Sequence, residues 1–143
     1  GVIRQGFMIY KNGKKPVVLF EEFVIEWFEL ISKGQWDMAF SKIDLAPSFG
    51  EAFTPETFRN EVENDHFCEG TIFRQAHHDI TYSNPKLMPR SGQPEIYEIE
   101  SSFNYSFLYD VPLNNEFSDL TSGWEFIDVG DSYLVRLDFL HVM

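Results

Sequence analysis

The chain has 143 residues, of which 43% are hydrophobic, a size that suits one domain with one core. Its formal net charge is −12, from 23 acidic and 11 basic residues. Such a surface repels nucleic acid and anionic membranes and attracts basic surfaces. The single cysteine, Cys68, excludes an internal disulfide. With no signal-peptide pattern and no apolar run long enough to span a bilayer, the sequence predicts a cytoplasmic protein.

The first fifteen residues carry four of the eleven basic residues and no acid. They contain an apolar patch, "GFMIY", followed by "KNGKK", a turn signal that predicts either a hairpin or a flexible lead into the domain. We therefore expect residues 1–15 to form a basic N-terminal segment and residues 16–143 to form a single domain. All twenty-three acids lie in that domain.

Three helices are predicted between residues 16 and 64. The first begins at Pro16, and its apolar residues recur at helical spacing as far as the "KG" stop signal at residues 33–34. "QWDMAFSKIDL" (residues 35–45) predicts a second, shorter helix. "FTPETFRNEVEN" (residues 53–64) predicts a third, with Thr54 as its cap.

After residue 68 the pattern changes from helical to alternating. Four strands are predicted, in residues 71–83, 95–113, 117–129 and 133–143. The loop at residues 83–95 is long for a hairpin, which is typical of a lid or a partner contact. Helices followed by antiparallel strands predict an α+β fold in which the helices cover one face of the sheet.

Two stretches carry a resemblance to a known superfamily. "SKGQWDMAF" joins the first two helices, and "FNYSFLYDVPL" is followed by two more alternating strands. This arrangement resembles the nuclear transport factor 2-like superfamily over residues 16–143. The resemblance implies a cone, in which a strongly curved antiparallel sheet wraps around the N-terminal helix.

A second likeness concerns "YDVPLNNEFSDLTSGWEF" and the ending "LDFLHVM". They are similar to a group of small bacterial proteins of this fold class, some of which are immunity proteins of polymorphic toxin systems. The superfamily also contains isomerases, dehydratases and binding proteins, so the fold alone leaves the function open.

The histidines raise the question of a metal or a catalytic site. His77 and His78 are neighbours on a predicted strand, so they point to opposite faces and cannot share one metal ion; we expect no metal. His78 is predicted to face the concave side. His141 shares an alternating face with Tyr133, Val135, Leu137 and Phe139. Together with the phenol of Tyr105, the two histidines would form the acid–base site of a pocket enzyme. The alternative is that each histidine is an ordinary core residue.

A row of acids offers a different site. Glu98, Glu100 and Asp110 lie on one face of the strand predicted at 95–113, and Glu116 and Asp119 extend the row to the next strand. If the strands are adjacent, this row forms a negative surface that suits a basic protein. One alternative is that Ser118, Asp119 and Thr121 only satisfy backbone groups of a turn at the strand entrance. The other is that the row is an ordinary solvated sheet face.

The leading hypothesis is a small non-enzymatic binding protein: an immunity protein that neutralises a basic toxin domain, such as a nuclease, by direct binding. It predicts no cofactor and no contact with nucleic acid or membrane. The alternatives are a pocket enzyme of isomerase or dehydratase type, a small-ligand-binding protein, and a homodimer formed through the sheet.

Overall fold

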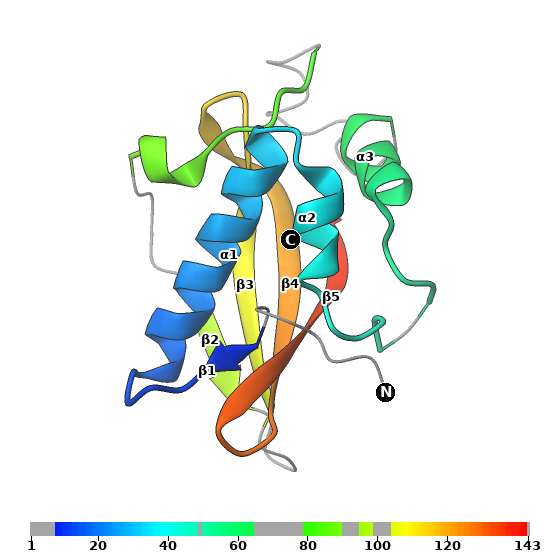
Figure 1. Ribbon diagram of the computed structural model, residues 1–143. Helices are drawn as coiled ribbons and strands as arrows, with labels where there is room; N and C mark the ends of the chain where they lie inside the picture. Colours follow the sequence, from blue (N-terminus) through cyan, green and yellow to red (C-terminus); the bar gives the residue numbers. More distant parts are fainter. Residues whose placement is uncertain (1–7, 49, 65–78, 90–94, 99–103, 143) are drawn as a thin grey trace.

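The computed structural model describes residues 8–48, 50–64, 79–89, 95–98 and 104–142. In this part of the chain, an antiparallel five-stranded sheet in the order β1-β5-β4-β3-β2 packs with three helices (Figure 1). The fold is α+β, as predicted, and the sheet is curled but not closed, which is compatible with a cone-like fold. No described helix is long and apolar enough to cross a membrane.

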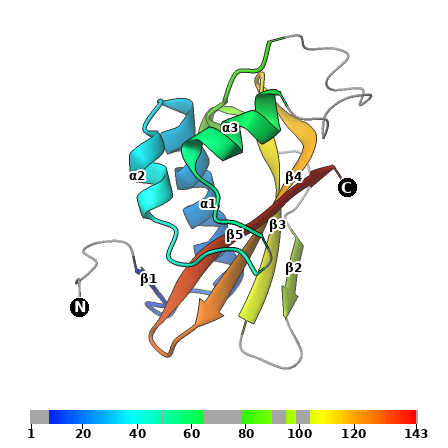
Figure 2. The ribbon, with the colours of Figure 1, turned by 90° about the vertical axis from the view of Figure 1, so that its right-hand side faces the viewer.

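The elements follow one another in the expected order of helices before the main strands. The helices are α1 (Pro16–Ser32), α2 (Trp36–Ser41), α3 (Pro55–Glu63) and the short 3₁₀ helix η2 (Pro85–Leu87). The strands are β1 (Ile9–Tyr10), β2 (Glu95–Glu98), β3 (Asn104–Leu113), β4 (Glu116–Asp128) and β5 (Ser132–Val142). Figure 2 shows α1 and α2 on one side of the sheet, and we call the face they cover the inner face.

Helix α1 forms the centre of the core because six of its apolar residues recur every three or four positions and are buried: Leu19, Phe20, Val24, Trp27, Phe28 and Ile31. The ring of Phe20 stacks on Phe126 of β4, with 4.0 Å between the ring centroids. The indole N–H of Trp27 donates to the backbone oxygen of Ala39 at 2.8 Å, which ties α2 to α1. The fully buried rings of the core come from both helices and strands: Phe20, Trp27, Phe28, Phe58, Phe107, Trp124 and Phe126. The concave space inside the sheet is therefore filled with aromatic side chains.

Helix α2 ends at Ser41, four residues before the predicted end, because the chain then turns to the sheet. The backbone N–H groups of Asp44 and Leu45 donate to the oxygen of Val135, and a carboxylate oxygen of Asp44 accepts from the Val135 N–H at 3.0 Å. Strand β1 pairs with β5 next to this point, from Ile9 opposite Tyr133. These two segments cover the edge of β5 from Ser132 to Arg136, which would otherwise present unpaired backbone groups.

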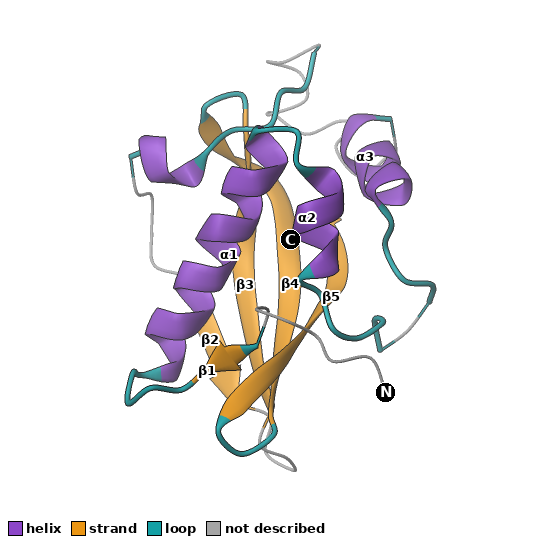
Figure 3. Ribbon diagram, in the orientation of Figure 1, coloured by secondary structure: helices purple, strands orange, loops and turns teal. Residues whose placement is uncertain are grey.

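The prediction of one long strand over residues 95–113 is wrong. Residues 95–98 and 104–113 form two strands, β2 and β3, that pair antiparallel (Figure 3). Tyr97 lies opposite Ser106, so it points to the face away from Tyr105, and half of its surface is exposed. Alternation cannot reveal such a reversal, because both strands keep a period of two residues.

The alternation of β5 also breaks, at a β-bulge. Phe139 pairs with Gly123 and Leu137 pairs with Trp124, so Asp138 is an extra residue with no partner on β4. An extra residue in a strand moves every later side chain of that strand to the opposite face of the sheet. Leu137 and Leu140 consequently lie in the core, whereas Phe139 and His141 lie on the opposite face, which we call the outer face.

The hairpin between β3 and β4 turns at "NN". Asn114 and Asn115 have φ of 51° and 63°, the two left-handed positions of a type I′ turn. The side chain of Asn114 accepts from the Thr81 N–H and donates to the Asp79 oxygen, so it also anchors residues 79–81. Of the strand predicted at 71–83, residues 71–78 lie outside the described part, and Tyr82 makes one isolated bridge to Leu113.

Replacing Gly123 tests the packing created by the bulge. A Cβ at this position would overlap the ring of Phe139, which lies directly over the glycine. We expect Gly123→Ala to lower the free energy of unfolding by about 1–3 kcal/mol, measured by urea denaturation.

The control is the same substitution in a Phe139→Ala background. Without the ring the added methyl group has room, so Gly123→Ala should then cost much less. Equal costs in both backgrounds would show that the ring does not restrict this position.

Candidate partner-binding face

No described helix covers β3 and β4 on the outer face, and α3 lies beside the C-terminal half of β5 (Figure 2). The strand register places the following side chains on it: Ser106, Leu108 and Asp110 of β3; Thr121, Glu125 and Ile127 of β4; and Leu134, Arg136, Phe139 and His141 of β5. The face therefore combines apolar residues with a small number of charged ones.

One row of polar side chains crosses three strands of this face. Asp110 pairs with Thr121, and Thr121 pairs with His141. The hydroxyl of Thr121 donates to a carboxylate oxygen of Asp110 at 3.0 Å. The imidazole of His141 packs beside the ring of Phe139, with 4.9 Å between the centroids. Ser118 does bond backbone groups, but these lie in strands β3 and β4 and not in a turn: its hydroxyl donates to the backbone oxygen of Val111 and accepts from the Leu120 N–H.

The residues of the pocket-enzyme hypothesis are not brought together in the described structure. Unbroken alternation from Tyr133 would place His141 on the inner face, but the bulge at Asp138 turns it outward, where it is exposed. Tyr105 does face inward, where its ring packs against Phe20 and Tyr133 in the aromatic core. His78 lies outside the described residues.

The predicted acidic row is divided by the register. Glu98 pairs with Tyr105, so it belongs to the inner-face side of β2, five positions along β3 from Asp110. Five positions of a strand span about 17 Å. Asp110, Glu116 and Asp119 are exposed and lie close to the turn between β3 and β4. We call these three residues the acidic hairpin end. Glu100 lies outside the described residues.

Ion pairs within the chain neutralise most of the described basic side chains. Arg136 pairs with Glu125, Arg59 with Glu63, and Lys86 with Glu29. The remaining three pairs are Lys11–Asp128, Lys14–Glu22 and Lys33–Glu29. Because these six basic groups are each held beside an acid, they add little to any attraction for anions. The negative excess is what the surface presents to an approaching partner.

The pair of Glu125 and Arg136 is the most buried of these. Nε of Arg136 lies 3.0 Å from Oε1 of Glu125, and their side chains are 20% and 12% exposed. Burial raises the pKa of Glu125, and the nearby guanidinium only partly offsets this effect. Arg136 also donates to the backbone oxygen of Ala46 and the hydroxyl of Ser48, so it holds the loop after α2 against β5.

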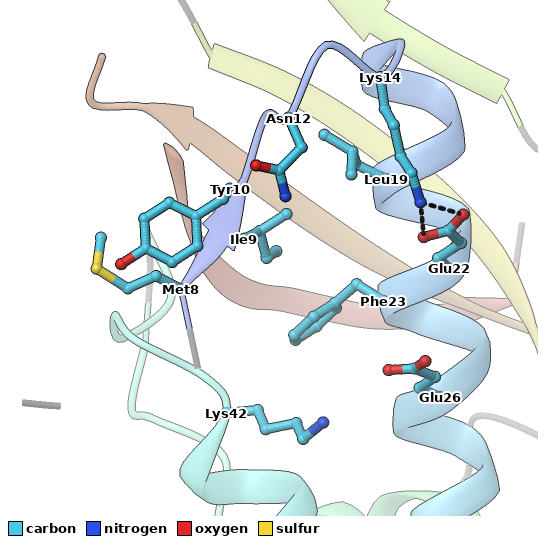
Figure 4. Close-up of a pocket in the computed structure, with 10 residues that line it drawn as sticks. All are labelled: Met8, Ile9, Tyr10, Asn12, Lys14, Leu19, Glu22, Phe23, Glu26 and Lys42. Atoms are coloured by element: carbon cyan, nitrogen blue, oxygen red, sulfur yellow. Dashed lines mark hydrogen bonds and ion pairs between the residues drawn. The ribbon is translucent and has the colours of Figure 1, made fainter. Parts of the chain in front are cut away.

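Two of the hollows on the surface of the described structure border the sheet. The first, of about 240 Å³, lies between β1, α1 and the end of α2 (Figure 4). Phe23, Ile9 and Leu19 contribute its apolar part, while Glu26 and Lys42 point into it from opposite sides. Because acids and lysines both line it, this hollow favours neither sign of charge.

The second hollow, of about 310 Å³, lies between the loop after α2, helix α3 and the C-terminal half of β5. The sequence pattern did not indicate it, because it depends on Asp138 and Phe139 and so on the bulge. Nothing in the alternation of residues 133–143 marks the position of an extra residue.

Among the described residues, no group of three or more His, Cys, Asp and Glu side chains could hold a metal ion. Comparison of the chain with family models, curated proteins and solved structures found no match.

The buried ion pair gives a pH-dependent prediction. Because the folded protein raises the pKa of Glu125 above 4.5, it binds the proton more readily than the unfolded chain does. Glu125 therefore lowers stability as the pH rises from 4.5 through the folded pKa. We expect Glu125→Gln to unfold at the same urea concentration as the parent at pH 7, or at a higher one.

Arg136→Met is the contrasting variant. It leaves a largely buried carboxylate without its counter-ion and frees the loop, so it should cost about 3 kcal/mol. A larger loss for Glu125→Gln than for Arg136→Met at pH 7 would contradict this account of the pair.

Proposed function

We propose that this chain is a non-enzymatic binding domain that holds a basic protein at its acidic hairpin end. The observation that carries the proposal is the distribution of charge. Six of the described basic side chains are paired within the chain: Lys11, Lys14, Lys33, Arg59, Lys86 and Arg136. Asp110, Glu116 and Asp119 lie exposed on the β3–β4 hairpin, between its turn and the Asp110–Thr121 pair. A negative surface of this kind accelerates the encounter with a positive one and excludes acidic competitors.

The filled interior favours binding over pocket catalysis. A pocket enzyme of a cone-like fold needs a polar cavity inside the curled sheet, with a carboxylate near an inward-facing histidine. Here that space holds the stacked rings of Phe20 and Phe126 and the buried indoles of Trp27 and Trp124. The charged side chains of the described structure lie on the exterior of the protein. A macromolecule can contact many of them at once, whereas a small substrate needs an enclosed pocket.

The most concrete form of the proposal is an immunity protein that neutralises a basic toxin domain, such as a nuclease. The likeness of residues 109–126 and 137–143 to small proteins of that kind supports it. A toxin domain that acts on nucleic acid carries a basic cleft, and an inhibitor that covers the cleft needs an acidic surface of similar size.

A homodimer is the second candidate, and the outer face favours it. Leu108, Ile127 and Leu134 are only partly buried there, and Tyr97 is half exposed. Such a face is also found where two sheets pack together. Sedimentation at several protein concentrations distinguishes this candidate from a monomer.

The proposed function is tested with the product of the neighbouring gene, titrated by calorimetry at low and high salt. We expect nanomolar binding that weakens as salt is added, because exposed charges are screened. The variant Asp110→Asn/Glu116→Gln/Asp119→Asn should bind at least about tenfold more weakly. Asn at position 110 keeps an acceptor for Thr121, so the fold is retained.

The matched control removes three exposed acids elsewhere: Asp37→Asn/Glu56→Gln/Asp131→Asn. The change in net charge is the same, so this variant should bind nearly as well as the parent. If both variants lose the same affinity, only the net charge matters and the acidic hairpin end is not the binding site. Absence of binding to the neighbouring gene product and to other basic toxin domains would remove the proposed function.

A further inference from the structure

The hollow beside β5 differs from the other described hollow in its charge. Its charged lining residues in the described structure are Glu51, Glu61 and Asp138; no described lysine or arginine lines it. The nearest arginine along β5, Arg136, is engaged with Glu125, Ala46 and Ser48. The hollow therefore presents a negative potential to a group that enters it.

The walls of the hollow are largely apolar and partly aromatic. Phe53 from the loop and Phe139 from β5 contribute rings, and the imidazole of His141 packs beside Phe139. A flat cation gains from contact with an aromatic face and pairs with carboxylates at its edge. The guanidinium of arginine matches both features, whereas the ammonium of lysine is a strongly hydrated point charge.

The hollow is held in shape from both sides. The backbone N–H of Ser48 donates to a carboxylate oxygen of Asp138 at 2.8 Å, which fixes the loop to the bulge. On the other side, Thr54 and Thr57 cap the first turn of α3 through reciprocal hydrogen bonds. A volume of about 310 Å³ is at the small end for ligand pockets, so the space suits one long side chain.

The hollow and the acidic hairpin end belong to one continuous surface. His141 lines the hollow, and the strand register joins it through Thr121 to Asp110. Strands lie about 4.8 Å apart, so His141 and Asp110 are separated by about 10 Å. A protein that covers the acidic hairpin end can therefore reach the hollow with a side chain.

We propose that this hollow receives an arginine side chain of the basic partner, with the guanidinium between Glu51 and Asp138 and its face against Phe139. This inference rests on the proposed function for the identity of the partner. The hollow itself can be tested without any partner, so that the two proposals fail separately.

The probe is N-acetyl-L-arginine amide, and its neutral counterpart is N-acetyl-L-citrulline amide, in which a urea group replaces the guanidinium. Each is titrated into the full ¹⁵N-labelled chain while amide chemical shifts are recorded. With the arginine probe, titrated up to about 50 mM, we expect amide shifts at Phe53, Thr57, Phe139 and His141 that reach saturation. The citrulline probe should bind at least about threefold more weakly.

The test variant is Glu51→Gln/Asp138→Asn, whose side chains keep the parent shape and the acceptor for Ser48. It should weaken the arginine probe at least about threefold. Glu22→Gln/Glu26→Gln, at the other hollow (Figure 4), makes the same charge change and should have no effect. Glu51→Gln alone, at an exposed position, serves if the double variant unfolds.

Shifts that do not saturate, shifts centred outside the hollow, equal binding of both probes or equal losses in both variants would each overturn the inference. If the hollow binds no probe while the partner still needs the acidic hairpin end, only this inference falls. If the probe binds and no basic partner does, the hollow remains and the proposed function falls.

Discussion

The β-bulge at Asp138 is the constraint on which the outer face depends. One extra residue in β5 leaves Leu137 and Leu140 in the core while it turns Phe139 and His141 outward. The ring of Phe139 then lies over Gly123, where a Cβ atom on any other residue would overlap it. Asp138, having no partner on β4, is available to bind the backbone of Ser48 and fix the loop. The bulge thus builds the surface as well as the packing, as bulges beside binding sites often do.

The inner face follows a different rule, because it is governed by aromatic packing around α1. Phe20 stacks on Phe126, and Trp27 packs against Phe28, Phe40, Phe58 and Trp124. Rings of this size each bury a large apolar area and leave little room for solvent. A core filled in this way stabilises the fold and also directs the chemistry of the molecule to its exterior. The function we propose, binding of a basic protein, uses this exterior.

The charged side chains divide into basic residues that join elements of the fold and acidic residues in excess of them. Basic residues stabilise contacts between elements: Lys11 joins β1 to β4 through Asp128, Lys86 joins η2 to α1 through Glu29, and Arg136 joins the loop after α2 to the sheet. Acids outnumber them two to one, so the excess remains on the surface. The surface that a partner contacts is therefore negatively charged.

The sequence by itself determined the fold class, the start of α1 at Pro16, the cap of α3 at Thr54 and the acidic character. These follow from local periodicity, capping and composition, which act within a few residues. Only the tertiary structure decided that Tyr97 and Tyr105 face opposite ways, that His141 points outward and that Glu98 lies apart from Asp110. Those features depend on which strands pair, in which register, and where an extra residue interrupts the pairing. Strand pairing is set by contacts between residues far apart in the chain. The alternating pattern of apolar and polar residues continues unchanged across a strand reversal or a bulge, so it does not reveal either one.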